Sequence, residues 1–113
     1  MPYIHLHITQ ELSAEKREEL QLAIGAIMPL IPEKNMNNTM IELTGGAALY
    51  MRGGPINGAF MELRVYKASP EDAKAAFFAA LSALLEEKLG IAPKDVYGNI
   101  TEMPHWCAGG KYS

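Results

Sequence analysis

Apolar and polar residues alternate at the start of the chain, then recur at helical spacing. Residues 2–9 have a period of two, which predicts a half-buried strand with Ile4, Leu6 and Ile8 on its buried side. Ser13 predicts a helix N-cap. The apolar stripe that follows has i, i+3, i+4, i+7 spacing and consists of Leu20, Ala23, Ile24 and Ile27. Pro29 ends this predicted helix, and alternation from Met40 to Thr44 predicts a second strand.

After a glycine-rich segment at 45–58, the same order of patterns returns. Phe60 to Tyr66 alternates as a strand, and Ser69 and Pro70 predict the next helix start as N-cap and first helical residue. The buried stripe of this helix comprises Ala73, Phe77, Ala80, Leu81, Leu84 and Leu85. Gly90 can end it in a left-handed conformation. Asp95 to Thr101 alternates as the last predicted strand.

The two halves of the chain register on each other at a shift of about 57 residues. This repeat predicts one domain, 1–113, made of two tandem β-α-β units at about 2–50 and 58–102. The expected fold class is α/β (α+β), with a four-stranded mixed sheet and two helices on one face. The other sheet face would carry His5, His7, Tyr97 and Asn99, and we expect an oligomer to cover it.

Composition and charge narrow the function classes. The formal net charge of −3 gives no reason to expect nucleic acid or an acidic membrane as a partner. The apolar runs are too short to span a bilayer. The first residues lack the pattern of a signal peptide, so we expect a cytoplasmic protein. Cys107 is the single cysteine, which excludes an internal disulfide.

The Met1-Pro2 start offers a specific chemistry. Removal of Met1 would leave a secondary amine at the beginning of a strand. A free α-amine has a pKa of about 7.7–8.0, and burial in an apolar pocket lowers it. Pro2 is therefore a candidate general base that takes a proton from carbon at neutral pH.

The stretch from Leu89 to Met103 reads Leu-Gly-Ile-Ala-Pro-Lys-Asp-Val-Tyr-Gly-Asn before Ile100. It resembles the "L-x-I-x-P-D-R-V-Y-I-N" segment of the macrophage migration inhibitory factor (MIF) and D-dopachrome tautomerase branch of the tautomerase superfamily, which is related to 4-oxalocrotonate tautomerase (4-OT). Pro2 matches the catalytic proline of that family. The resemblance covers nearly the whole chain and implies a MIF-like fold and a homotrimer.

The same resemblance implies a substrate site. Lys34 falls where the family has a lysine that holds the substrate carboxylate, and Val65 where a backbone N–H contacts the same group. Tyr97 and Asn99 match residues that enter the pocket from the neighbouring subunit. The chain departs from the mammalian members at residues 55–58, which lack their C-x-x-C motif, so thiol redox activity is not implied.

The resemblance implies a cofactor-independent keto–enol tautomerase that acts on an α-keto acid such as phenylpyruvate, with Pro2 as base. Two alternatives stay open. One is a hydratase or dehalogenase of the same superfamily, which would need paired arginines and an activating carboxylate. The other is a non-catalytic, cytokine-like interaction protein.

His5 and His7 share one face of the first predicted strand, a spacing that can bind a metal ion. The sequence gives them no apparent acidic or cysteine partner, so we expect interface packing and no metal site. Arg64 should face away from the Val65 side and form an interface or surface ion pair. The role of Arg52 stays open.

Overall fold

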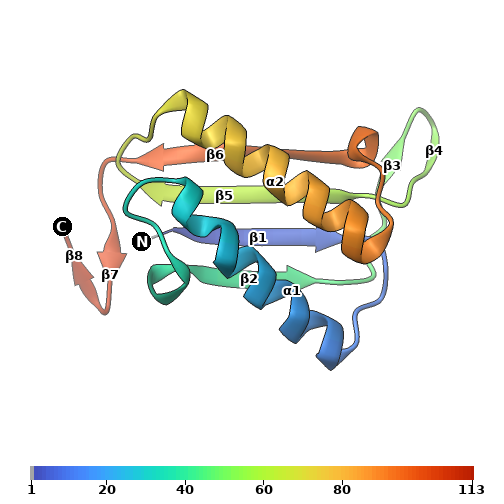
Figure 1. Cartoon of the computed structure of the whole chain (residues 1–113), viewed down its shortest axis with the longest axis horizontal. Coiled ribbons are helices and arrows are strands. Elements are labelled where there is room, and N and C mark those ends of the chain that lie inside the picture. Colours follow the sequence, from blue (N-terminus) through green and yellow to red (C-terminus); the bar gives the residue numbers. More distant parts are fainter. Residues whose placement is uncertain (1) are drawn as a thin grey trace.

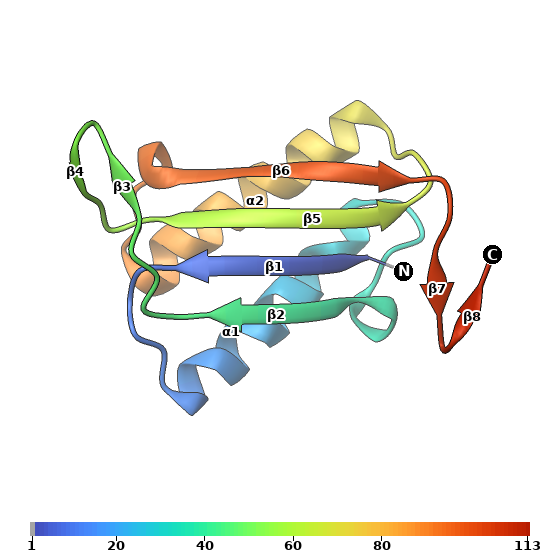
Figure 2. The ribbon, with the colours of Figure 1, turned by 180° about the vertical axis from the view of Figure 1, so that it is seen from behind.

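A four-stranded sheet in the order β2–β1–β5–β6 carries both helices on one face in the computed structural model, which describes residues 2–113 (Figure 1, Figure 2). The strands are β1 (Tyr3–Ile8), β2 (Met40–Thr44), β5 (Ala59–Tyr66) and β6 (Val96–Met103), and the helices are α1 (Ala14–Ile27) and α2 (Glu71–Leu89). β1 is parallel to β2, β5 is parallel to β6, and the central pair β1–β5 is antiparallel. The predicted mixed sheet of two β-α-β units is confirmed.

The helix ends follow local chemistry, with one correction. The Ser13 side chain caps α1 by accepting the Lys16 N–H, as predicted. Gly90 ends α2 at a φ of 67°, also as predicted. At the start of α2, however, Pro70 takes the cap position. The prediction that Ser69 caps α2 was wrong, because the helix begins at Glu71, one residue later than expected, and no side chain caps it. The Ser69 N–H donates to Glu102 of β6.

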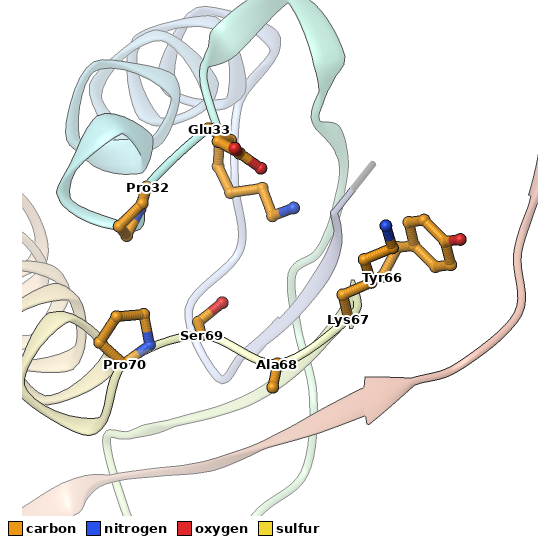
Figure 3. Close-up of a pocket in the computed structure, with 8 residues that line it drawn as sticks. Pro32, Glu33, Tyr66, Lys67, Ala68, Ser69 and Pro70 are labelled. Atoms are coloured by element: carbon orange, nitrogen blue, oxygen red, sulfur yellow. The ribbon is translucent and has the colours of Figure 1, made fainter.

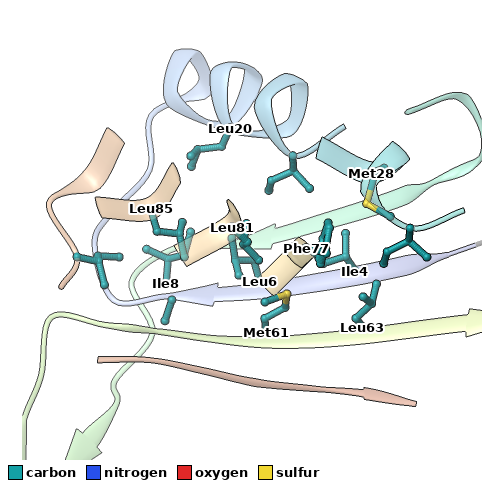
Figure 4. Close-up of a cluster of buried hydrophobic side chains, with 14 of the residues drawn as sticks. Ile4, Leu6, Ile8, Leu20, Met28, Met61, Leu63, Phe77, Leu81 and Leu85 are labelled. Atoms are coloured by element: carbon teal, nitrogen blue, oxygen red, sulfur yellow. The ribbon is translucent and has the colours of Figure 1, made fainter. Parts of the chain in front are cut away.

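The core lies between the helices and the sheet (Figure 4). Its fully buried members come from the predicted stripes of both strands and both helices and include Ile4, Leu6, Ile8, Leu20, Ile24, Leu63, Phe77, Leu81 and Leu85. Burial of this apolar surface is the main force that holds the two layers together. The opposite sheet face has no helix on it (Figure 2).

Two short hairpins extend from opposite ends of the sheet (Figure 1). One is formed by β3 (Tyr50–Met51) and β4 (Gly54–Pro55), the other by β7 (Cys107–Ala108) and β8 (Lys111–Tyr112). The β7–β8 hairpin lies at the end where β1 begins (Figure 2). Within residues 2–113, neither helix combines the length and apolar character that crossing a bilayer requires.

Candidate active site

Pro2 is buried at the start of the central strand β1. Its carbonyl accepts a hydrogen bond from the Met40 N–H at 3.0 Å, which ties the residue to β2. The β1–β5 register pairs Tyr3 with Arg64, so one further step along the ladder places Pro2 opposite Val65. Two of the predicted site residues therefore meet across the sheet. The expected removal of Met1 concerns a residue outside the described range.

A cavity of about 220 Å³ opens beside Pro2. Tyr3 and Met40 line it from the sheet, and residues 106–109 line it from the C-terminal segment. Trp106 is among them and supplies an aromatic wall, whereas Tyr112 is 74% exposed and does not line this cavity. The cavity gives a small molecule access to the ring that would act as base.

Lys34 lines a second cavity, of about 460 Å³, between the segments 32–34 and 66–70 (Figure 3). The Lys34 N–H donates to the Ile31 carbonyl at 3.1 Å, which closes the turn after α1. Tyr66 and Lys67 line the opposite wall. Because Tyr66 directly follows Val65 in β5, this cavity lies at the same end of the sheet as Pro2, although the two residues line separate hollows.

Two residues that line the larger cavity have left-handed backbones. Glu33 and Lys67 both have a φ of 69°, a conformation that is uncommon for residues with a side chain. The Lys67 ammonium lies 5.1 Å from the centre of the Tyr66 ring. The cavity thus carries two lysines, Lys34 and Lys67, and one glutamate, Glu33. The sequence reasoning missed Tyr66 and Lys67, whose adjacency to Val65 was the available signal.

Tyr97 and Asn99 lie far from Pro2 in the same chain. Tyr97 pairs with Phe60, five residues before Val65 along β5. At roughly 3.3 Å per residue, this separates Tyr97 from the Pro2 end by about 17 Å. Tyr97 instead lines an apolar hollow of about 250 Å³ with residues of the β3–β4 hairpin. One chain therefore brings Pro2, Val65 and Lys34 to one end of the sheet and leaves Tyr97 and Asn99 elsewhere.

The sheet face without helices is polar and internally bonded. The Tyr3 hydroxyl donates to Glu42, and this bond raises the pKa of the phenol. His7 hydrogen-bonds Glu62 at 2.8 Å, which lowers the pKa of that carboxyl. Arg64 lies 3.8 Å from the same carboxylate, which confirms its predicted ion pair on this face.

Arg52, whose role the sequence left open, lies in the loop of the β3–β4 hairpin. Its guanidinium lies 3.4 Å from the Asp95 carboxylate, and its own backbone has a φ of 54°. Asp95 is buried and directly precedes Val96, the first residue of β6. Arg52 thus anchors the hairpin at the end of the sheet opposite Pro2.

The mixed sheet and the paired β-α-β units give a fold that solved MIF-like and 4-OT structures share. No family model matches the chain, and no curated protein matches it in sequence. Among solved structures, the chain is similar to Leishmania major MIF2, with a TM-score of 0.89 and 17% identity over 100% of this chain and 97% of that one. At this identity the likeness establishes the fold.

Two further structures share the fold. A fused 4-OT wild-type asymmetric trimer has a TM-score of 0.83 at 20% identity, covering 96% of this chain and 94% of that one. The protein Pt0534, solved after inactivation by 2-oxo-3-pentynoate, has a TM-score of 0.78 at 22% identity, covering 89% and 85% of the two chains. The expected resemblance to MIF-like and 4-OT-like proteins is confirmed at the level of the fold.

Proposed function

We propose that this protein is a cofactor-independent keto–enol tautomerase that uses the Pro2 nitrogen as its general base once Met1 has been removed. The single observation that carries the proposal is the placement of Pro2, buried at the start of the central strand and beside a cavity. Burial disfavours the charged form of an amine. A neutral ring nitrogen at this position could accept a proton from carbon near neutral pH.

The proposed substrate is an α-keto acid such as phenylpyruvate. Its carboxylate would bind Lys34 and the backbone N–H of Val65, the residue that the register places opposite Pro2. Lys34 and Lys67 together outweigh the single carboxylate of Glu33 in this cavity, which supports an anionic substrate group there. The aromatic part of the substrate would contact Trp106 in the neighbouring hollow.

The proposed assembly is a homotrimer in which Tyr97 and Asn99 of a neighbouring subunit complete the pocket. Within one chain, Tyr97 lies about 17 Å and Asn99 about 10 Å along the strand direction from the Pro2 end, which supports this arrangement. So does the trimeric assembly named for the similar 4-OT structure. The helix-free sheet face, with its polar side chains, offers a surface that a second copy could cover.

In the proposed reaction, the Pro2 nitrogen removes a proton from one end of the enol–keto system. The C=C and C=O electrons shift, and the same proton or one from solvent is returned at the other end. Donors from Tyr97 and Asn99 would stabilise the charge that develops on the oxygen. Every step is a proton transfer, so the chemistry balances without an oxidant or a metal.

The two alternatives make different demands on the chain. A hydratase or dehalogenase would need paired arginines near Pro2, whereas Arg52 and Arg64 pair with Asp95 and Glu62. A non-catalytic interaction protein would keep its fold and assembly without needing the Pro2 amine. Variants at Pro2 therefore separate an enzyme from an interaction protein.

The test combines intact mass with the phenylpyruvate enol–keto assay on the same samples. We expect chains that lack Met1 to be active and Pro2→Ala to lose roughly 100-fold or more in kcat/KM. Pro55→Ala, in the exposed β4 strand, is the matched control and should keep full activity. Equal, slow rates for the processed wild type and Pro2→Ala would refute the catalytic role.

A covalent probe tests the nucleophilic character of the same nitrogen. Incubation with 2-oxo-3-pentynoate, which inactivates the similar protein Pt0534, should add mass to the N-terminal peptide of the processed wild type. Lys34→Ala should slow that labelling if the lysine binds the carboxylate of the probe, and Lys111→Ala should not. Labelling confined to Cys107 or to surface lysines would contradict a reactive Pro2.

A further inference from the structure

Three potential metal ligands converge on the helix-free face of the sheet, on the side of β1 opposite to Pro2. His5 and His7 are two residues apart on β1 and therefore share this face. Their ring centres are 3.9 Å apart. Glu62 of β5 lies directly opposite His5 in the antiparallel register. The sequence gave the two histidines no acidic partner, and the strand pairing supplies one.

One carboxylate oxygen faces both imidazoles. Glu62 Oε2 is 2.8 Å from His7 Nε2 and 3.7 Å from His5 Nδ1. One ligand atom from each of the three residues lies within 4.8 Å of the others. Tetrahedral zinc, with ligands at about 2.1 Å, separates its ligand atoms by about 3.4 Å. Side-chain shifts below about 1 Å would therefore admit an ion.

The surroundings orient these ligands. His5 Nε2 lies 2.8 Å from the Thr44 hydroxyl, so a proton on Nε2 can be donated there. In that tautomer, the His5 Nδ1 lone pair faces Glu62 Oε2 at 3.7 Å and is available to a metal ion. Metal-ligating histidines usually donate their second ring N–H to such a partner. Arg64 contacts the other oxygen, Oε1, and leaves Oε2 available.

The neighbouring charges do not block an ion at this position. Glu42 lies 3.7 Å from His5 Nε2 and adds negative charge to the cluster. In the single chain, the side chains of His5, His7 and Glu62 are 18%, 30% and 36% exposed, so an ion can reach them before a second copy covers this face. Two imidazoles and one carboxylate form a donor set that suits zinc and neighbouring transition metals.

We propose that His5, His7 and Glu62 form a binding site for one divalent transition-metal ion of the zinc type, with a fourth position left for water. This reverses the expectation of mere packing at the two histidines. The site does not depend on the tautomerase proposal, because Pro2 belongs to the opposite side of β1, with the buried Ile4 and Leu6.

The test is titration of the metal-free, untagged full-length chain with zinc against a competing chelator dye. We expect one ion per chain. His7→Asn and Glu62→Gln should each weaken binding at least tenfold, and Thr44→Val should weaken it roughly tenfold by removing the orienting hydroxyl. His105→Asn is the matched control, because this histidine lies in the C-terminal segment, stacked on Tyr112, and should bind normally.

Cobalt provides an independent readout of geometry. The visible absorption of bound Co²⁺ should be intense, as for a four-coordinate ion, and should be lost in His7→Asn. Circular dichroism and gel filtration of each variant separate loss of the site from loss of the fold. Zinc affinity that is unchanged in both His7→Asn and Glu62→Gln, or that falls equally in His105→Asn, would overturn the proposal.

Discussion

Gly98 tests how closely β6 approaches β5. It lies on the core side of β6 and pairs with Met61. A Cβ atom built at Gly98 would lie 2.6 Å from the Met61 carbonyl oxygen and 3.0 Å from the Met61 Cβ. Ordinary van der Waals contact between carbon atoms is about 3.5–4.0 Å. The nearest obstacle is backbone, so no rotamer change can remove it and Gly98→Ala must move the two strands apart.

The expected cost follows from two opposing effects. Forcing an extra methyl group into a packed region costs about 1–3 kcal/mol. Replacing glycine by alanine recovers about 0.4–1 kcal/mol by restricting the unfolded chain. The net destabilisation of Gly98→Ala should therefore be about 1–2 kcal/mol. That corresponds to a decrease of roughly 5–30-fold in the ratio of folded to unfolded chains.

Urea unfolding followed by circular dichroism, at one fixed chain concentration, measures this difference. Gly54→Ala is the matched control, because nothing lies within 4 Å of a Cβ built at that position. It should raise the free energy of unfolding by about 0.4–1 kcal/mol, because only the effect on the unfolded chain remains. Equal stability of Gly98→Ala and wild type would show that the strands can separate without cost and would refute the reasoning.

Three other perturbations have outcomes fixed by the structure. Leu81→Ala removes a fully buried side chain from α2. It should lower the free energy of unfolding, measured by urea unfolding, by about 2–5 kcal/mol. A loss below about 1 kcal/mol would contradict tight packing at this position. Ser13→Ala removes the α1 cap and should lower the same quantity by about 1 kcal/mol, whereas no change would mean that the cap is not needed. The Ser69 N–H and the Lys74 ammonium lower the pKa of Glu102 below its ordinary value of 4.5, so its stabilising effect is present above pH 4.5 and is lost as the pH falls through the lowered value. Glu102→Gln should therefore flatten the acid side of the stability–pH profile, and an unchanged acid side would contradict this assignment.

Strand bounds and helix ends that depend on residues close in the sequence could be predicted from the sequence. Alternation located the second strand at Met40–Thr44 with the observed bounds. The Ser13 cap and the left-handed Gly90 also follow from local chemistry. The α2 start differs from its local prediction, because Pro70 takes the cap position without a side-chain hydrogen bond. The bond from the Ser69 N–H to Glu102, more than thirty residues away, is a contact that no local pattern predicts.

In the candidate site, too, local features could be predicted from the sequence and long-range contacts could not. The position of Pro2 on the first strand could be predicted from its local pattern, whereas its placement opposite Val65 depends on the antiparallel register of β1 with β5. The burial of Lys74 is a second feature that the sequence pattern does not predict. It interrupts the apolar stripe of α2, yet it is buried because its ammonium pairs with Glu71 and with Glu102 of β6. Burial of a charged group requires partners that periodicity does not reveal.

The β1–β5 register positions both Pro2 and the proposed metal ligands, which lie on opposite faces of β1. The same pairing that places Pro2 opposite Val65 places His5 opposite Glu62, so a slip of this register would destroy both at once. Side chains of a strand alternate between its two faces, and Pro2 therefore belongs to the buried face whereas His5 belongs to the open one. Glu62 pairs with Asn99 of the proposed tautomerase site, whereas His7 does not. In His7→Asn, loss of zinc binding with intact tautomerase activity therefore identifies a local effect, and loss of both identifies a displaced strand.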